Sequence, residues 1–176
     1  VVSGNAPLDA RVRNALIVSQ VLGLDAPVHA GAGRPLLAPP RHAQHVHGVT
    51  GLDGPEHPEL TRAAASDDAV GFIIDTVRST DDVWLVPIGP LTNIALALRQ
   101  APDIAERVAG ISIMGGSATV GNVTSTGEFN VWADPDAAAI VWESGARILM
   151  AGLNLTHQFC VTQATIDALR AMDTTA

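Results

Sequence analysis

The sequence lacks the features that mark a membrane-spanning, nucleic-acid-binding or disulfide-bonded protein. No apolar run approaches the roughly 18 to 20 residues that a spanning helix needs, and no basic leader followed by an apolar run opens the chain. The formal charge is −8, without any cluster of basic residues, so the chain would repel a phosphate backbone. The single cysteine, Cys160, excludes an internal disulfide and favours a reducing compartment. We therefore expect a cytoplasmic protein with no nucleic-acid or membrane partner, and Cys160 as a core or half-buried residue.

What is present is typical of an α/β fold. The chain has 176 residues, 47% of them hydrophobic, and a mean hydropathy of +0.26, which suits one domain whose sheet is covered on both faces. Apolar strand patterns alternate with helical patterns, which predicts an open, mostly parallel sheet flanked by helices. The expected strands cover residues 27–30, 83–88, 108–114 and 147–151, and the expected helices cover 8–22, 64–78, 93–100, 135–144 and 162–172.

The stretch from Ile111 to Asp134 organises the rest of the chain. It begins as a buried strand, breaks at Gly115-Gly116 and continues as a long polar loop. It ends at Asp134-Pro135, a helix start with an Asp cap and Pro at the first helical position. Open α/β sheets bind ligands at the carboxyl ends of their strands, so the polar residues of this loop are candidates for ligand contact.

Caps and acidic pairs punctuate the predicted helices. Ser66 and Thr92 are expected to cap the helices that cover 64–78 and 93–100, and Thr162 the last helix. The pairs Asp67-Asp68 and Asp81-Asp82 lie at a helix end and in a turn. We interpret both pairs as capping and solvation, since Asp is common there for those reasons alone.

Residues 31–58 form a stretch rich in Gly and Pro that contains His42, His45, His47 and His57. Histidines this close together raise the question of a zinc site. No Cys or carboxylate lies at zinc-ligand spacing from them, so we expect a mobile loop over a pocket.

Four motifs, in order, resemble those of the inosine-uridine preferring nucleoside hydrolases. The first three are Gly4-Asn5, His45-Val-His-Gly48 with Gly51-Leu-Asp-Gly54, and Val86-Pro-Ile-Gly-Pro-Leu-Thr-Asn93. The fourth combines Met114-Gly-Gly, Asn122, Glu128-Phe-Asn130 and Trp132-Ala-Asp-Pro-Asp-Ala-Ala. Four ordered matches over most of the chain are far more specific than any single one.

The resemblance implies a nucleoside hydrolase-like, Rossmann-like fold and an enzyme of purine or pyrimidine salvage. The reaction of the family is hydrolysis of the N-glycosidic bond of ribonucleosides to free base and ribose. Calcium orients a water and the ribose 2′ and 3′ hydroxyls, a carboxylate deprotonates that water, and the transition state resembles an oxocarbenium ion. The resemblance also implies a homo-oligomer, either a dimer or a tetramer.

The resemblance assigns roles to seven residues. It implies that His47 lies on the base side and that the backbone carbonyl of Ile88 is a calcium ligand. It implies contact with ribose for Asn5, Met114, Asn122, Glu128 and Asn130. These polar side chains suit a neutral polyol, because a carboxylate accepts hydrogen bonds and a carboxamide both donates and accepts them. Without the resemblance, Asn5, Asn122 and Glu128 would be interpreted as turn residues and Met114 as part of the core.

The chain departs from the family pattern at both ends. The motif Asp-Thr-Asp-Pro-Gly-x-Asp-Asp, which supplies calcium ligands and the general base, is expected before Val1, and the chain starts without an initiator Met. The carboxylate that completes the metal shell, with its neighbouring His, is expected after Ala176. Calcium takes six to eight oxygen ligands, and only the Ile88 carbonyl of that set lies within the chain. We therefore expect residues 1–176 to be a single partial, incomplete domain that contains most of the ribose site, and no catalytic residue is identified within it.

The expected first strand of the sheet also belongs to the segment before Val1. We expect its absence to leave an unpaired edge and apolar surface, and hence marginal stability or association through that edge.

Two functions follow from this pattern. The first is a nucleoside hydrolase that needs flanking segments for its metal site. The second is a truncated, non-catalytic relative that at most binds ribosides. A nucleotide-binding module is disfavoured, because the Gly-rich loop lacks a Lys and has no phosphate-binding spacing. The preferred base is left open.

Overall fold

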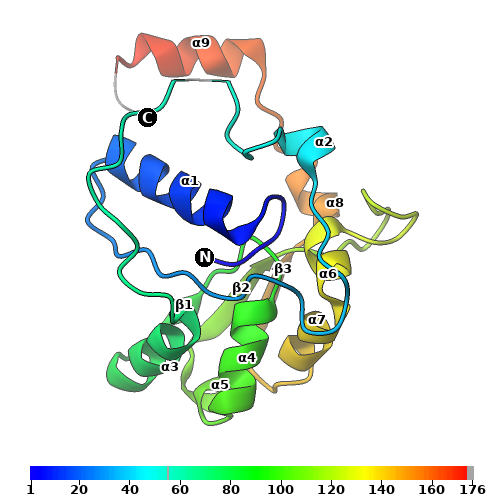
Figure 1. Ribbon diagram of the computed structural model, residues 1–176. Helices are drawn as coiled ribbons and strands as arrows, with labels where there is room; N and C mark the ends of the chain where they lie inside the picture. Colours follow the sequence, from blue (N-terminus) through cyan, green and yellow to red (C-terminus); the bar gives the residue numbers. More distant parts are fainter. Residues whose placement is uncertain (55, 174–176) are drawn as a thin grey trace.

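A three-stranded parallel sheet lies at the centre of the computed structural model, which describes residues 1–54 and 56–173 (Figure 1). Its strands are β1 (Trp84–Leu85), β2 (Gly110–Met114) and β3 (Ile148–Ala151), in the order β1-β2-β3. Leu85 pairs with Ile111, and Met114 pairs with Ala151. The predicted open, parallel α/β fold is confirmed.

Helices connect the strands and flank the sheet. α4 and α5 lie between β1 and β2 in the chain, and α6 and α7 lie between β2 and β3. α9 lies at the opposite end of the view from α3 and α5 (Figure 1). None of the described helices is both long and apolar enough to cross a membrane. The helices are α1 (Leu8–Val21), α2 (Gln44–His47), α3 (Ala69–Ser79), α4 (Thr92–Gln100), α5 (Ile104–Arg107), α6 (Phe129–Ala133), α7 (Pro135–Trp142), α8 (Leu153–Thr156) and α9 (Gln163–Ala171).

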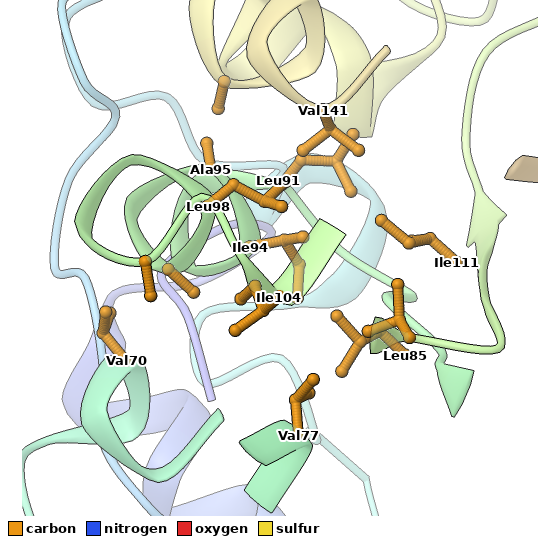
Figure 2. Packing of buried hydrophobic residues seen from close by; sticks show 14 of the residues in the cluster. Val70, Val77, Leu85, Leu91, Ile94, Ala95, Leu98, Ile104, Ile111 and Val141 are labelled. Carbon is orange, nitrogen blue, oxygen red and sulfur yellow. The ribbon is translucent and has the colours of Figure 1, made fainter. Parts of the chain in front are cut away.

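The hydrophobic core is centred on α4. Leu91, just before α4, and Ile94, Ala95 and Leu98 within it lie among buried side chains of the sheet, α3, α5 and α7 (Figure 2). Ile111 of β2 is completely buried in the same cluster. Each large side chain buried in this way contributes about 1.5–3 kcal/mol to folding. The core therefore fixes α4, whose first residues lie next to the carboxyl end of β1.

The start of α3 differs from the prediction. The helix begins at Ala69 because the Asp68 side chain accepts a hydrogen bond from Gly71 N at 2.8 Å, which makes Asp68 the cap. Ser66 instead pairs with His29 in an isolated parallel bridge, and the hydroxyl of Ser66 lies 2.8 Å from His29 Nδ1. The predicted start at residue 64 with a Ser66 cap was wrong. The interpretation of Asp68 as a capping residue is confirmed.

Other elements are shorter or more exposed than expected. The predicted strand 27–30 is reduced to the single His29 bridge, and the strand 83–88 is reduced to β1. The interpretation of 83–88 as buried was wrong, since Val86 is 63% and Ile88 74% exposed. Cys160 is exposed as well, contrary to expectation. α2, α5 and α8 were missed because four residues are too few for a helical period to show.

A cavity lies beside residues 86–90, the stretch that follows β1. Beyond it the first residues run beside the segment 29–32, with the Val1 ammonium donating to the His29 carbonyl at 2.7 Å and Ser3 N to the Ala32 carbonyl at 2.9 Å. The cavity has a volume of about 660 Å³ and separates Val1 and Val2 from the stretch after β1. Most of its lining is apolar. No described residue pairs with the outer edge of β1 as a strand.

The solvent-accessible surface is large for the mass. It measures 10235 Å² at 18.2 kDa. A folded monomer of this mass exposes roughly 8,100 Å² by the usual scaling. The difference is apolar in part, as the exposure of Val86 and Ile88 shows. Such surface favours association.

We predict that the chain associates through the outer edge of β1. In sedimentation velocity, the average mass should rise with concentration, and Val86→Lys should suppress the rise because a charged side chain on a strand edge opposes pairing. Leu37→Lys is the matched control, since Leu37 is equally apolar and 80% exposed but does not line the cavity. A monodisperse monomer with a cooperative melt would contradict the prediction.

Candidate functional site

The candidate site begins where β1 and β2 end side by side. Met114 is the last residue of β2, and its backbone N–H donates to the Pro87 carbonyl at 3.0 Å. The Pro87 carbonyl therefore faces β2. Successive residues of an extended chain point their backbone groups to opposite sides. Val86 and Ile88 accordingly make no backbone hydrogen bond with any described residue. The Ile88 carbonyl is therefore free to accept at the outer edge, where it borders the cavity.

Asn130 is held in place at the carboxyl end of β2. Its side chain is buried, and Nδ2 donates to the Met114 carbonyl at 3.1 Å and lies 3.2 Å from Met114 Sδ. The first turn of α6 thus carries Asn130 to the carboxyl end of β2. No described residue donates to Asn130 Oδ1, which leaves that oxygen as an acceptor.

Glu128 is the N-cap of α6. It is only 2% exposed, and Oε2 accepts from Gly116 N at 2.9 Å and from Val131 N at 3.2 Å. It therefore ties the glycine turn after β2 to the start of α6, a role that was not predicted. Gly116 has a φ of 73°, a conformation that favours glycine. Oε1 of Glu128 accepts no hydrogen bond within the part of the chain that the structure describes.

Asn122 lies on the exposed loop between β2 and α6. Its Oδ1 accepts a hydrogen bond from Phe129 N at 2.9 Å, which fixes the loop against the first residue of α6. This contact occupies the oxygen and leaves the Asn122 amide N–H groups as donors. Asn122, Glu128, Asn130 and Met114 are thereby brought together around the end of β2 and the start of α6.

Asn5 and His47 belong to the other side of the candidate site. Both line the 660 Å³ cavity together with Ile88. The Asn5 carbonyl accepts from Ala43 N at 2.9 Å, which ties it to the residue before α2, and His47 is the exposed last residue of α2. The seven predicted residues thus form two groups, one at this cavity and one around the end of β2 and the start of α6. Glu128 lines a separate cavity, and the hydrogen bond from Met114 N to the Pro87 carbonyl links the two chain segments.

The turn after α2 is organised by Asp53. Its carboxylate accepts from Val49 N at 2.7 Å, from Thr50 N at 3.0 Å and from the Thr50 hydroxyl. The hydroxyl contact, followed by the two backbone contacts, lowers the pKa of Asp53. The carboxylate therefore accepts these hydrogen bonds at neutral pH. They weaken only as the pH falls through the lowered pKa, where the carboxylate is protonated.

The described residues do not form a calcium site by themselves. No three His, Cys, Asp or Glu side chains among residues 1–54 and 56–173 lie close enough together to share a metal ion. Arg11 also lines the cavity, where burial lowers the pKa of its guanidinium, and it makes no ion pair with a described carboxylate. The Ile88 carbonyl suits a metal ion that is otherwise bound by carboxylates. The partly desolvated Arg11 guanidinium suits a carboxylate close by.

Comparison with known proteins identifies the family. The family model described as inosine-uridine preferring nucleoside hydrolase matches residues 1–176. The chain belongs to this nucleoside hydrolase family. The pyrimidine-specific ribonucleoside hydrolase RihB of Escherichia coli strain K12 / DH10B is 45% identical over 174 residues, which are 98% of this chain and 55% of that protein. The chain therefore spans about half the length of the curated relatives it matches.

Solved nucleoside hydrolases have the same fold. A purine-preferring ribonucleoside hydrolase from Gardnerella vaginalis superposes with a TM-score of 0.93 at 36% identity, over 98% of this chain and 57% of that chain. A plant nucleoside hydrolase superposes with a TM-score of 0.87 at 32% identity, over 98% and 56% of the two chains.

We predict that Glu128 stabilises this nucleoside hydrolase fold through its cap. Glu128→Ala leaves two backbone N–H groups without their acceptor and should lower the free energy of unfolding by about 1–3 kcal/mol. Glu128→Gln keeps one oxygen for both donors and should cost less than about 1 kcal/mol. Urea denaturation of the three proteins measures both values. Equal losses in the two variants would contradict the capping role.

Proposed function

We propose that this chain forms the ribose-binding part of a nucleoside hydrolase, which hydrolyses the N-glycosidic bond of a ribonucleoside to base and ribose. The observation that supports it most is the placement of buried Glu128 and Asn130 at the carboxyl end of β2, beside the free Ile88 carbonyl. Both side chains are fixed by backbone contacts and each retains an oxygen with no described donor.

The polar groups of the site suit the hydroxyls of a sugar. Glu128 Oε1 and Asn130 Oδ1 supply acceptors, and the Asn122 amide supplies donors. Asn5 and Met114 complete our proposed ribose contacts, and His47 is our proposed base-side residue. Because Glu128 and Asn130 are held in place before substrate arrives, they need little reorganisation as positive charge develops on the ribose.

We further propose that residues 1–176 are one partial domain, completed by a segment outside them. An extended segment fits the outer edge of β1, where Val86 and Ile88 have free backbone groups and the cavity is mostly apolar. Acidic side chains on that segment would compensate the Arg11 guanidinium. We assign the general base and the other metal ligands to segments outside residues 1–176.

Calcium is our proposal for the metal, with the Ile88 carbonyl as its ligand from this chain. The relatives differ in the base that their names state, pyrimidine for one and purine for another, so either base remains compatible with this chain. A role in nucleoside salvage, a cytoplasmic location and a dimeric or tetrameric assembly complete the proposal, all three by analogy with the family.

The alternative function is riboside binding without catalysis. It is favoured by one observation, namely that four of the proposed ribose contacts are grouped around the end of β2 and the start of α6 within this chain. Binding and hydrolysis are separable by experiment.

Release of ribose from inosine and uridine tests the proposal. We would compare the chain itself with a chimera in which it replaces the 174 matched residues of the Escherichia coli relative, each with and without calcium. Calcium-dependent release by the chimera alone is expected, because the chimera supplies the flanking segments. The matched control is the chimera with Glu128→Gln, which keeps the cap but should reduce kcat/KM by on the order of a hundredfold through loss of a sugar contact.

Each result has a distinct meaning. An inactive chimera that still binds inosine or uridine would favour the non-catalytic alternative. Activity of the chain alone would contradict the assignment of the catalytic carboxylates to segments outside residues 1–176.

A further inference from the structure

Residues 31–43, which we name the tether, have no helix or strand among them, yet they connect several parts of the candidate site. The tether runs from the segment beside Val1 to the start of α2. Three of its residues are proline, which limits the backbone freedom of the tether and has no N–H group to donate. Its position must therefore be fixed by contacts with other elements.

The first anchor of the tether is the carboxyl group of Asp134. This residue is fully buried, and Oδ2 accepts from the Thr92 hydroxyl at 2.6 Å and from Leu36 N at 3.0 Å, while Oδ1 accepts from Ala137 N at 3.1 Å. One side chain thus joins the tether, the first residue of α4 and the first turn of α7. Both oxygens accept hydrogen bonds and the residue has no exposed surface, so the carboxyl group is closed to a ligand.

The second anchor is the side chain of Asn93. Its Oδ1 accepts from Ala32 N at 2.8 Å, and its Nδ2 donates to the Val1 carbonyl at 3.0 Å. The amide lies so close to Gly31 that a Cβ at Gly31 would overlap it. A side chain at position 31 would therefore have to displace the Asn93 amide.

The far end of the tether holds the predicted site residues. His42 Nδ1 donates to the Gly4 carbonyl at 2.8 Å, and Ala43 N donates to the Asn5 carbonyl at 2.9 Å. The Arg41 guanidinium stacks on the Trp132 ring at 3.8 Å. The tether therefore links α4 to Asn5 and to α2, which ends at His47, so that the positions of these parts depend on one another.

We propose that Thr92 and Asn93 are positioning residues, which place Asn5 and His47 at the riboside pocket by anchoring the tether, Thr92 through Asp134 and Asn93 directly. This inference rests on the proposed function for the identity of the pocket, but the anchoring itself is independent of any activity. Neither residue needs to touch substrate.

Amide hydrogen exchange on the chain tests the Asp134 anchor. Thr92→Val removes the hydroxyl and keeps the size, whereas Thr92→Ser keeps the hydroxyl and is the matched control. Exchange at the Leu36 and Ala43 amides should accelerate on the order of tenfold in Thr92→Val, and should stay near the wild-type rate in Thr92→Ser. Ile111, in the core of the sheet, should be affected less. Acceleration at Leu36 without Ala43, or equally at Ile111, would overturn the proposal.

A glycine pair tests the Asn93 anchor. Gly31→Ala should displace the Asn93 amide and accelerate exchange at Ala32 and Ala43. Gly33→Ala is the matched control, because the nearest atom to a Cβ there is 3.8 Å away, in Leu8. Equal behaviour of the two variants would refute a positioning role for Asn93.

The kinetic readout uses the chimera. Thr92→Val and Gly31→Ala should raise KM for inosine or uridine on the order of tenfold with a smaller change in kcat, because the displaced residues contact the bound nucleoside. Thr92→Ser and Gly33→Ala should stay within about twofold. An inactive parent chimera would defeat the proposed function and leave the exchange results to decide the anchoring. An active parent with unchanged KM in both variants would defeat the positioning role.

Discussion

The buried carboxyl group of Asp134 is the contact on which the arrangement of the site depends. Burying a carboxyl group is costly unless its oxygens receive hydrogen bonds, and here three donors from three parts of the chain supply them. The same side chain begins α7 and fixes the tether against α4. Because α4 is surrounded by the hydrophobic core, its position is fixed. The tether is therefore held against the most buried part of the molecule.

The candidate site accordingly has one side with buried, hydrogen-bonded side chains and one side with exposed residues. Around the end of β2, Glu128 and Asn130 are buried and bound to backbone groups of the glycine turn and of Met114. Just after β1, Val86 and Ile88 are exposed and make no backbone hydrogen bond within residues 1–54 and 56–173, and a mostly apolar cavity separates them from Val1. Under the proposed function, this division corresponds to sugar contacts supplied by this chain and metal ligands supplied largely by segments outside residues 1–176.

Local rules were sufficient for much of the fold. The Asp134-Pro135 start, the Thr162 cap and the strand that ends at Met114 follow from nearest neighbours in sequence, and the structure contains all three. The α3 start was wrong because Ser66 is drawn into a bridge with His29, a partner 37 residues away. Thr92 was expected to cap its own helix, but its hydroxyl donates to a carboxyl group 42 residues further on.

The site was less predictable than the fold for the same reason. Sequence motifs identified Glu128 and Asn130 as candidate ribose contacts, but their backbone partners lie across the turn from β2 to α6. The anchoring role of Asn93 depends on Val1 and Ala32, which lie 92 and 61 residues away in the chain. Contacts over such distances are set by the packing of α4 against the sheet, which no local pattern reveals.

We propose that a strand from outside residues 1–176 completes the sheet beside β1. Amide hydrogen exchange at Val86 and Ile88 tests it most directly, measured in the chain alone at low concentration and in the active chimera. We predict fast exchange at both amides in the chain and strong protection in the chimera, with little change at Ile111. Equal exchange at Val86 and Ile88 in the two proteins would show that no strand pairs with this edge and would contradict completion of the sheet beside β1.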